Sequence, residues 1–338
     1  TMLEAFYATE RGSLEDATIN GGFDLHPELV WVDLIAPSQE EQEWVFDAYE
    51  QNLPTLKSLE DISSSARFYR DDDGILHIST YFLTKNKNYQ VEGDPEDSSN
   101  MLANVQTVAF ILHKNRLFTL RGEKLVAFRA FRARARRNDY DIDYKDPTWI
   151  LLGLLEAKLD ELADILEDIH KDLESYSTEV LNVRHREQTL DLDDMITRLA
   201  QKEDMLGKAQ LCLIDLRRVL TFLSRPRALG SHIYDADIRE LSEDVRSLVE
   251  HDAFLFQKVR FLLDTTSGFI NTEQNDTIRR FSILPSMLAP PMLIASIYGM
   301  NTEVLPFAHG ATSFFVVITI LIAFFVGPLI YFRWKKWI

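Results

Sequence analysis

Two long runs without a charged side chain, residues 281–300 and 311–332, constrain this chain more than any other feature of its sequence. They contain 20 and 22 residues, and each is long enough to cross about 30 Å of hydrocarbon as a helix. A single run of this kind could be a buried core helix. Two of them, separated by only ten residues, instead predict a membrane hairpin.

Basic residues flank this hairpin on one side only. Arg279 and Arg280 precede the first run, whereas residues 301–310 contain no Lys or Arg. The second run is followed by a basic inner rim, Arg333, Lys335 and Lys336. By the positive-inside rule, we expect both termini in the cytosol and only residues 301–310 outside it.

Charge and cysteine content exclude several classes of protein. The chain has 36 Lys and Arg against 53 Asp and Glu, a net charge of −17, so we expect no nucleic acid partner. Its one cysteine, Cys212, cannot form an intramolecular disulfide. The sequence has no glycine-rich phosphate loop, nucleophile elbow or metalloprotease motif. We therefore expect no enzyme, no catalytic residue and no cofactor.

Two long heptad patterns precede the hairpin. Apolar residues recur in steps of three and four from Leu152 to Val180 and again from Leu192 to Leu223, which predicts two amphipathic helices. We expect them to pack as an antiparallel pair, the second ending before Pro226. The acidic residues crowded along the first helix are interpreted as a solvated face, with an ion-attracting field as the alternative.

A third helix is expected to begin near Asp235 and to continue into the first uncharged run, about 65 residues or about 100 Å in all. One heptad grid along it, the pore grid, selects Gln257, Phe261 and Gly268 together with a pore stripe whose members are mostly small, polar or flexible: Asp264, Asn271, Asn275, Ile278, Ser282, Pro285, Ala289, Met292 and Ser296. If several copies pack in parallel, this pore stripe would line a channel with an apolar constriction. The alternative is an ordinary helix-packing seam, in which small residues are also favoured.

The N-terminal part predicts mixed α and β structure. Val30–Leu34 has the pattern of a strand, and Ser38 with Glu41 forms a capping box for a helix that reaches about Tyr49. Residues 71–74, Asp-Asp-Asp-Gly, predict a hairpin turn. A calcium loop is disfavoured because no ligand pattern continues beyond the glycine.

Three further features of this part have structural interpretations. Val105–Leu112 and Arg116–Leu120 predict a second hairpin. Five arginines between Arg129 and Arg137 are expected to meet acidic neighbours rather than a ligand. The eight histidines of the whole chain show no paired metal spacing and are interpreted as surface or satisfied residues.

The first uncharged run ends in Tyr298-Gly299-Met300-Asn301, and a second membrane helix with a basic end follows it. This arrangement resembles the CorA family of divalent-cation channels, and Gly268–Asn271 and Glu273–Asn275 are similar to its proteobacterial magnesium-transport branch. The resemblance implies an α+β cytosolic domain, then long α-helices and a two-helix C-terminal transmembrane hairpin. It also implies a funnel-shaped homopentamer surrounded by lipid in the bacterial inner membrane.

The resemblance further implies domain boundaries. They are 1–145 for the cytosolic α/β domain, 146–231 for the helix pair, 232–280 for the stalk helix, 281–300 for the pore-lining span, 301–310 for the outer loop, 311–332 for the second span and 333–338 for the basic tail.

Functional residues follow from the same resemblance. The outer selectivity loop would comprise Gly299, Met300, Asn301 and Glu303, which could hold hydrated Mg²⁺ through its water shell. Asn275 matches the pore asparagine of the family, and Asp264 falls where the family has a pore carboxylate. Glu240 and Asp244 are candidates for a regulatory Mg²⁺ site between neighbouring subunits.

The sequence departs from the family pattern near the pore. The magnesium branch usually follows its signature with Phe-Glu-x-Met-Pro-Glu-Leu, whereas residues 302–307 keep Glu303 and Pro306 but lack the second acid. Met292 stands where threonine is common, and Ala289 replaces a bulkier apolar residue. The resemblance makes Mg²⁺ uptake, with Co²⁺ and Ni²⁺ tolerated, the leading hypothesis, and these departures leave room for the zinc-transporting branch of the family. Zn²⁺ transport and a non-conducting membrane-anchored scaffold are the alternatives.

Overall fold

The computed structural model describes residues 2–17, 29–60, 67–85, 103–137, 142–182, 192–226, 228–300 and 311–335. It divides into two compact units, Thr1–Leu262 and Leu263–Ile338. The helices are α1 (Gln39–Tyr49), α2 (Leu56–Glu60), α3 (Val126–Arg137), α4 (Pro147–Asn182), α5 (Leu192–Leu223), α6 (Asp235–Tyr298) and α7 (Ala311–Trp334). Helix α6 crosses the boundary and contributes residues to both units.

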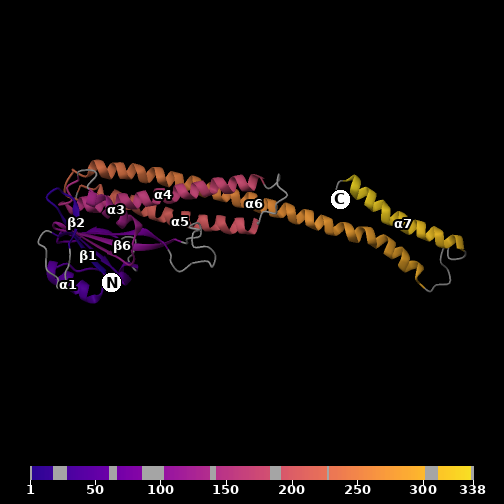
Figure 1. The fold of residues 1–338 in the computed structure, drawn as a ribbon, viewed down its shortest axis with the longest axis horizontal. Helices are drawn as coiled ribbons and strands as arrows, with labels where there is room; N and C mark the ends of the chain where they lie inside the picture. Colours follow the sequence, from indigo (N-terminus) through magenta and orange to yellow (C-terminus); the bar gives the residue numbers. More distant parts are fainter. Residues whose placement is uncertain are drawn as a thin grey trace. The chain divides into compact units, whose positions relative to one another are not determined.

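A seven-stranded sheet forms the centre of the first unit (Figure 1), in the order β2-β1-β3-β7-β6-β5-β4. The strands are β1 (Met2–Ala8), β2 (Leu14–Ala17), β3 (Leu29–Ile35), β4 (Phe68–Arg70), β5 (Leu76–Lys85), β6 (Ala103–His113) and β7 (Arg116–Arg121). β3 and β7 pair in parallel, and the other neighbours are antiparallel. The sheet is therefore mixed.

Successive side chains of the central strands point to opposite faces of this sheet, as the pleat requires. Val32 and Phe118 join a core that includes side chains of α1 and α2. Trp31 is fully buried on the other face, stacked on Phe6 at 4.5 Å and edge-on to Phe131 of α3 at 5.7 Å. The sheet thus lies between two apolar layers.

The predicted capping box and the predicted hairpin turn of this domain are both confirmed by the structure. Ser38 Oγ accepts from Glu41 N at 3.2 Å, and Ser38 N donates to Glu41 Oε2 at 2.8 Å, which is the predicted capping box. The Asp-Asp-Asp-Gly turn joins β4 to β5: Asp71 Oδ1 accepts from Ile75 N at 2.8 Å, and Gly74 has a φ of +81°. The hairpin of β1 and β2 is absent from the sequence prediction.

The arginines of α3 meet acidic residues, as predicted. Arg132 pairs with Glu4 of β1, and Arg136 pairs with Asp16 of β2. These two contacts fasten α3 to the first hairpin, so the basic cluster has a structural role in this domain.

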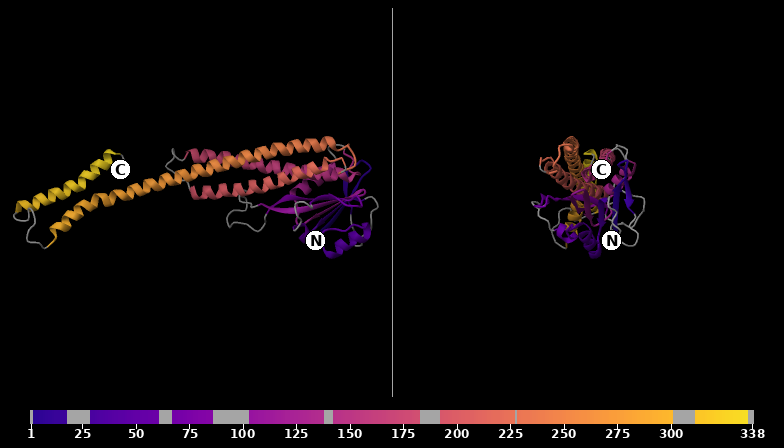
Figure 2. Two further views of the ribbon diagram at one scale, coloured as in Figure 1. Left: turned by 180° about the vertical axis from the view of Figure 1, so that it is seen from behind. Right: turned by 90° about the vertical axis from the view of Figure 1, so that its left-hand side faces the viewer.

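The helices α4 and α5 form the predicted antiparallel pair. Lys158 of α4 lies 3.9 Å from Asp215 of α5, and Asp172 lies 2.5 Å from Lys202. Residue numbers therefore rise along one helix as they fall along the other. The first part of α6 runs beside this pair in Figure 1 and in the left view of Figure 2. This part of α6 has a buried apolar stripe of Ile238, Leu241, Val245, Leu255, Val259 and Leu262.

A buried polar cluster joins the helix pair to the sheet. Asp215 accepts from Thr80 Oγ1 at 2.5 Å and from Tyr81 N at 2.9 Å. Lys158 Nζ donates to Thr80 Oγ1 at 2.9 Å, and Arg67 lies 3.7 Å from Asp215. Burial lowers the pKa of Lys158, whereas the nearby Asp215 carboxylate raises it. Because a buried charge without a partner is costly, this cluster fixes where the helices sit on β5.

The second unit holds the rest of α6 and all of α7. Both helices are long and apolar enough to cross a membrane, with 6% and 0% of their most apolar stretches buried. Exposed apolar surface of this extent indicates contact with lipid or with other copies. The predicted fold class is confirmed: a sheet-containing domain is followed by long helices and two candidate membrane spans.

Candidate functional site

The predicted pore stripe lies entirely on α6, and all nine of its side chains are exposed in the single chain. Ile278 and Met292, which are apolar, are 58% and 65% exposed. In the first unit, the buried stripe of α6 occupies other heptad positions, and Gln257 and Phe261 on the pore grid are exposed. The stripe is therefore available to other copies of the chain, and its role as a pore remains a prediction.

Three prolines change the backbone of α6 within this stripe region. Pro285, Pro290 and Pro291 lie inside the helix, and proline cannot donate the usual amide hydrogen bond to the carbonyl four residues earlier. The carbonyl oxygens of Phe281, Ser286 and Met287 thus lack that donor. Free carbonyl dipoles at membrane depth are tolerated where they face protein or a water-filled cavity.

The C-terminal end of α6 is described only as far as the first two residues of the predicted selectivity loop. Gly299 N donates to Ala295 O at 2.9 Å, and Met300 N donates to Ile297 O at 3.2 Å. A Cβ on Gly299 would lie 3.3 Å from the Ala295 carbonyl oxygen, so glycine suits this closed helix end. The predicted loop residues Asn301 and Glu303 lie outside the described residues.

The N-terminal end of the first predicted span and the C-terminal end of the second carry basic residues. Arg279 pairs with Asp276 at 3.2 Å, and Asp276 directly follows Asn275 in the sequence. Arg333 lies in the last turn of α7, and Lys335 N donates to Tyr331 O at 3.0 Å. Lys336, the third predicted member of the inner rim, lies outside the described residues.

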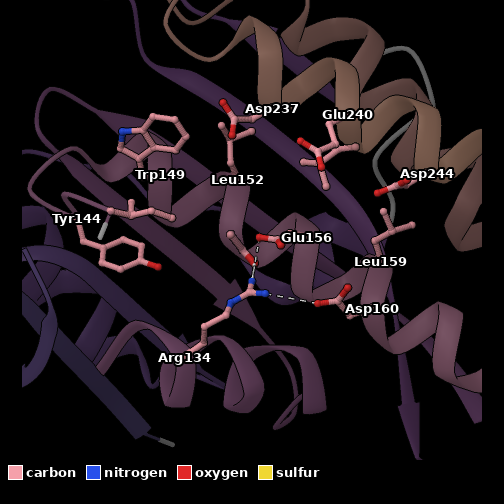
Figure 3. A pocket seen from close by; sticks show the side chains of 13 residues that line it. Arg134, Tyr144, Trp149, Leu152, Glu156, Leu159, Asp160, Asp237, Glu240 and Asp244 are labelled. Atoms are coloured by element: carbon pink, nitrogen blue, oxygen red, sulfur yellow. Dashed lines mark hydrogen bonds and ion pairs between the residues drawn. The ribbon is translucent and has the colours of Figure 1, made fainter. Parts of the chain in front are cut away.

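The predicted regulatory residues line a pocket of about 460 Å³ within the first unit (Figure 3). Glu240 and Asp244 of α6 reach it from one side. From the other elements come Arg134 of α3 and two acids of α4, Glu156 and Asp160. The other labelled side chains of its wall are Tyr144, Trp149, Leu152, Leu159 and Asp237 (Figure 3).

Arg134 is the basic residue of this pocket, and it faces the two acids of α4. Its guanidinium lies 3.0 Å from Glu156 and 3.5 Å from Asp160. Burial raises the pKa of both carboxyls, and Arg134 opposes that rise. The acids of α6 add to it, since Glu240 raises the pKa of Glu156 and Asp244 raises that of Asp160. The pocket therefore has an excess of negative charge that a cation would relieve.

Oxygen donors of this kind suit Mg²⁺, yet one chain does not complete a site. Among the described residues, no three His, Cys, Asp or Glu side chains are grouped to hold a metal ion. Glu240 and Asp244 were predicted from the family resemblance, and Arg134 meets acidic residues, as predicted for the basic cluster of α3. The sequence pattern placed Asp160 on a solvated face, gave Glu156 no role, and did not indicate that these two acids would meet Arg134. Their proximity depends on how α3 and α4 pack, which no local pattern in the sequence reports.

Comparisons with known proteins bear on the whole chain. The model of the family described as CorA-like Mg²⁺ transporter protein matches residues 27–336. "Magnesium transport protein CorA" of Mannheimia succiniciproducens is 38% identical over 309 residues, which are 91% of this chain and 92% of that protein. The protein of the same name from Escherichia coli is 39% identical over 316 residues, with the same two coverages of 91% and 92%.

Solved structures show the same fold at low sequence identity. The complete CorA magnesium transporter from Methanocaldococcus jannaschii has a TM-score of 0.75 at 18% identity and covers 100% of this chain and 99% of its own. The cytoplasmic domain of ZntB from Vibrio parahaemolyticus has a TM-score of 0.51 at 14% identity, over 80% of this chain and 98% of its own.

Proposed function

This chain belongs to the CorA-like family of Mg²⁺ transporter proteins, and on that premise we propose that it carries Mg²⁺ across a membrane through a pore lined by α6. Relatives at 38% to 40% identity over 91% of the chain are named as magnesium transport proteins. The family consists of transporters and channels rather than enzymes. The observation that carries the pore proposal is the exposed stripe of mostly small, polar or flexible side chains along one membrane-length helix.

Along this stripe the ion would travel with much of its water. Mg²⁺ gives up water reluctantly, so the carboxamides of Asn271 and Asn275 would contact it through hydrating water. Further along α6, Ile278, Ala289 and Met292 offer the ion no ligand and would form the constriction that closes by dewetting. An inside-negative potential contributes about 2.3 kcal/mol per charge per 100 mV, twice that for a divalent ion, which makes uptake favourable without ATP.

A single helix cannot enclose a pore, so the proposal requires several copies. We propose the homopentamer that the family resemblance implies, in the bacterial inner membrane with both termini in the cytosol. The exposed stripe of each α6 would face the central axis, and the apolar surface of α7 would face lipid. The Asn301 ring would select hydrated Mg²⁺ at the outer mouth.

Cytosolic Mg²⁺ would regulate such a pore through the acidic pocket. Glu240 and Asp244 would bind the ion together with an acid from the neighbouring subunit, because one chain supplies too few grouped ligands. Loss of the ion would leave like charges facing one another and would favour separation of the subunits. The charge-removing pair Glu240→Gln and Asp244→Asn should weaken inhibition of flux by Mg²⁺ on the cytosolic side.

Zn²⁺ is the second candidate cargo, favoured by the departures at Ala289, Met292 and residues 302–307. A scaffold that has lost conduction is the third candidate. Flux into proteoliposomes that hold the purified chain, followed with dyes selective for Mg²⁺ and for Zn²⁺, separates the three. Mg²⁺ flux altered by Asn301→Ala supports the proposal, Zn²⁺ flux alone assigns the protein to zinc, and no flux of either ion favours the scaffold.

A further inference from the structure

Two histidines that are far apart in the sequence meet on the cytosolic helices. His170 lies on α4 and His251 on α6, and His170 Nδ1 is 3.2 Å from His251 Nε2. The ring centroids are 5.5 Å apart, and the His170 side chain is 34% exposed. Both residues belong to the first unit, so the pair is held by the packing of one compact body.

The spacing of these two nitrogens matches the bite of a metal ion. Zn²⁺ binds imidazole nitrogen at about 2.0–2.1 Å in tetrahedral geometry, which places two such nitrogens about 3.3 Å apart. The observed separation of 3.2 Å therefore accommodates one ion after a small rotation of the rings. Mg²⁺ prefers oxygen ligands, whereas imidazole suits Zn²⁺, Ni²⁺ and related ions.

A carboxylate sits where it would support His170 as a ligand. Glu174 Oε1 lies 3.5 Å from Nε2 of His170, the nitrogen that does not face His251. Metal-ligating histidines usually donate their other ring N–H to a carboxylate, carbonyl or water. The nearby carboxylate of Glu174 would favour a proton on Nε2, which leaves the lone pair of Nδ1 directed toward His251.

We propose that His170 and His251 form a transition-metal site on the stalk, selective for Zn²⁺, Co²⁺ or Ni²⁺ over Mg²⁺. The two imidazoles supply two ligands, and water fills the remaining positions, because the described residues contain no group of three ready ligands. The site crosses from α4 to α6, so a bound ion would fasten the stalk helix to its neighbour. It is separate from the acidic pocket and does not depend on which ion the pore carries.

Calorimetric titration of Zn²⁺ into the detergent-solubilised full chain tests this site. A millimolar excess of Mg²⁺ throughout occupies the oxygen-ligand sites, so that the imidazole site dominates the heat. The variants are His170→Gln and His251→Gln, which keep a polar side chain of similar size at partly buried positions. His232→Gln is the matched control, since His232 is 2.9 Å from the carboxylate of Asp235 and is 82% exposed.

We expect one Zn²⁺ per chain to be lost equally in His170→Gln and His251→Gln and retained in His232→Gln. Glu174→Gln should weaken the affinity by about 10–100-fold. Co²⁺ absorption in the visible range gives a second readout: the shift and intensification of the ligand-field bands relative to hydrated Co²⁺ should be lost with either pair variant. Zn²⁺ binding of unchanged stoichiometry and affinity in both pair variants, or no Zn²⁺ binding to the original chain, would overturn the proposal.

Discussion

Asp215→Ala should destabilise this protein strongly, because it removes the carboxylate that faces a buried lysine. Asp215 and Lys158 are 3% and 2% exposed, and without Asp215 the described contacts of Lys158 Nζ would be the Thr80 hydroxyl at 2.9 Å and the face of the Phe82 ring at 5.0 Å, neither of which carries a negative charge. Removing one member of a buried ion pair costs about 3–5 kcal/mol. For a unit of this size, that cost lowers the melting temperature by roughly 6–20 °C.

The assay is thermal unfolding of the detergent-solubilised chain, followed by far-ultraviolet circular dichroism. Asp204→Ala is the matched control: Asp204 also lies on α5 and pairs with Lys208 at 2.5 Å, but it is 46% exposed, and exposed pairs contribute less than about 1 kcal/mol. Adding Lys158→Met to Asp215→Ala should recover part of the loss, since the unpaired ammonium is gone. The reasoning is refuted if Asp215→Ala lowers the melting temperature no more than Asp204→Ala.

Three further predictions concern single positions. Gly153→Ala should lower the free energy of unfolding by about 1–3 kcal/mol in the same assay, because the new Cβ would lie 2.4 Å from the ring of the buried Phe131. Gly207→Ala is the control and should not destabilise the protein, since a Cβ at Gly207 meets nothing within 4 Å. Cys212 should resist alkylation at pH 8 until the chain is unfolded. Burial raises the pKa of its thiol from 9.0 to about 11, which lowers the thiolate fraction about 100-fold. Rapid labelling of the folded chain would contradict this. Ser38→Ala should lower stability by about 1 kcal/mol through loss of the helix cap, and an unchanged melting temperature would show that the capping box contributes nothing.

Local chemistry made much of the fold predictable. The capping box at Ser38, the Asp-Asp-Asp-Gly turn and the long heptad patterns each depend on residues close in sequence, and all three are confirmed. The third helix, predicted at about 65 residues, has 64 and continues through its three prolines. In contrast, the first hairpin was not predicted, since β2 has only four residues. The pairing of β1 with β3 is long-range and leaves no periodic signal.

The parts of the site that could not be predicted depend on the register between helices. Arg134 meets Glu156 across α3 and α4, and His170 meets His251 across 81 residues of sequence. A shift of one helical turn would separate either pair without changing any heptad pattern. The same holds for Asp215 and Lys158, each of which is merely a polar residue within an apolar stripe when only the sequence is considered.

The central claim, that Mg²⁺ passes along the exposed stripe of α6, is tested most directly by Mg²⁺ flux into proteoliposomes holding the original chain, Asn275→Ala or Thr272→Ala. Thr272 is also exposed on α6 but lies off the stripe, where its hydroxyl donates to Gly268 O at 2.9 Å. The account predicts Mg²⁺ flux that Asn275→Ala changes and Thr272→Ala leaves as it was. Equal flux from all three chains, or flux no greater than that of empty vesicles, would contradict it.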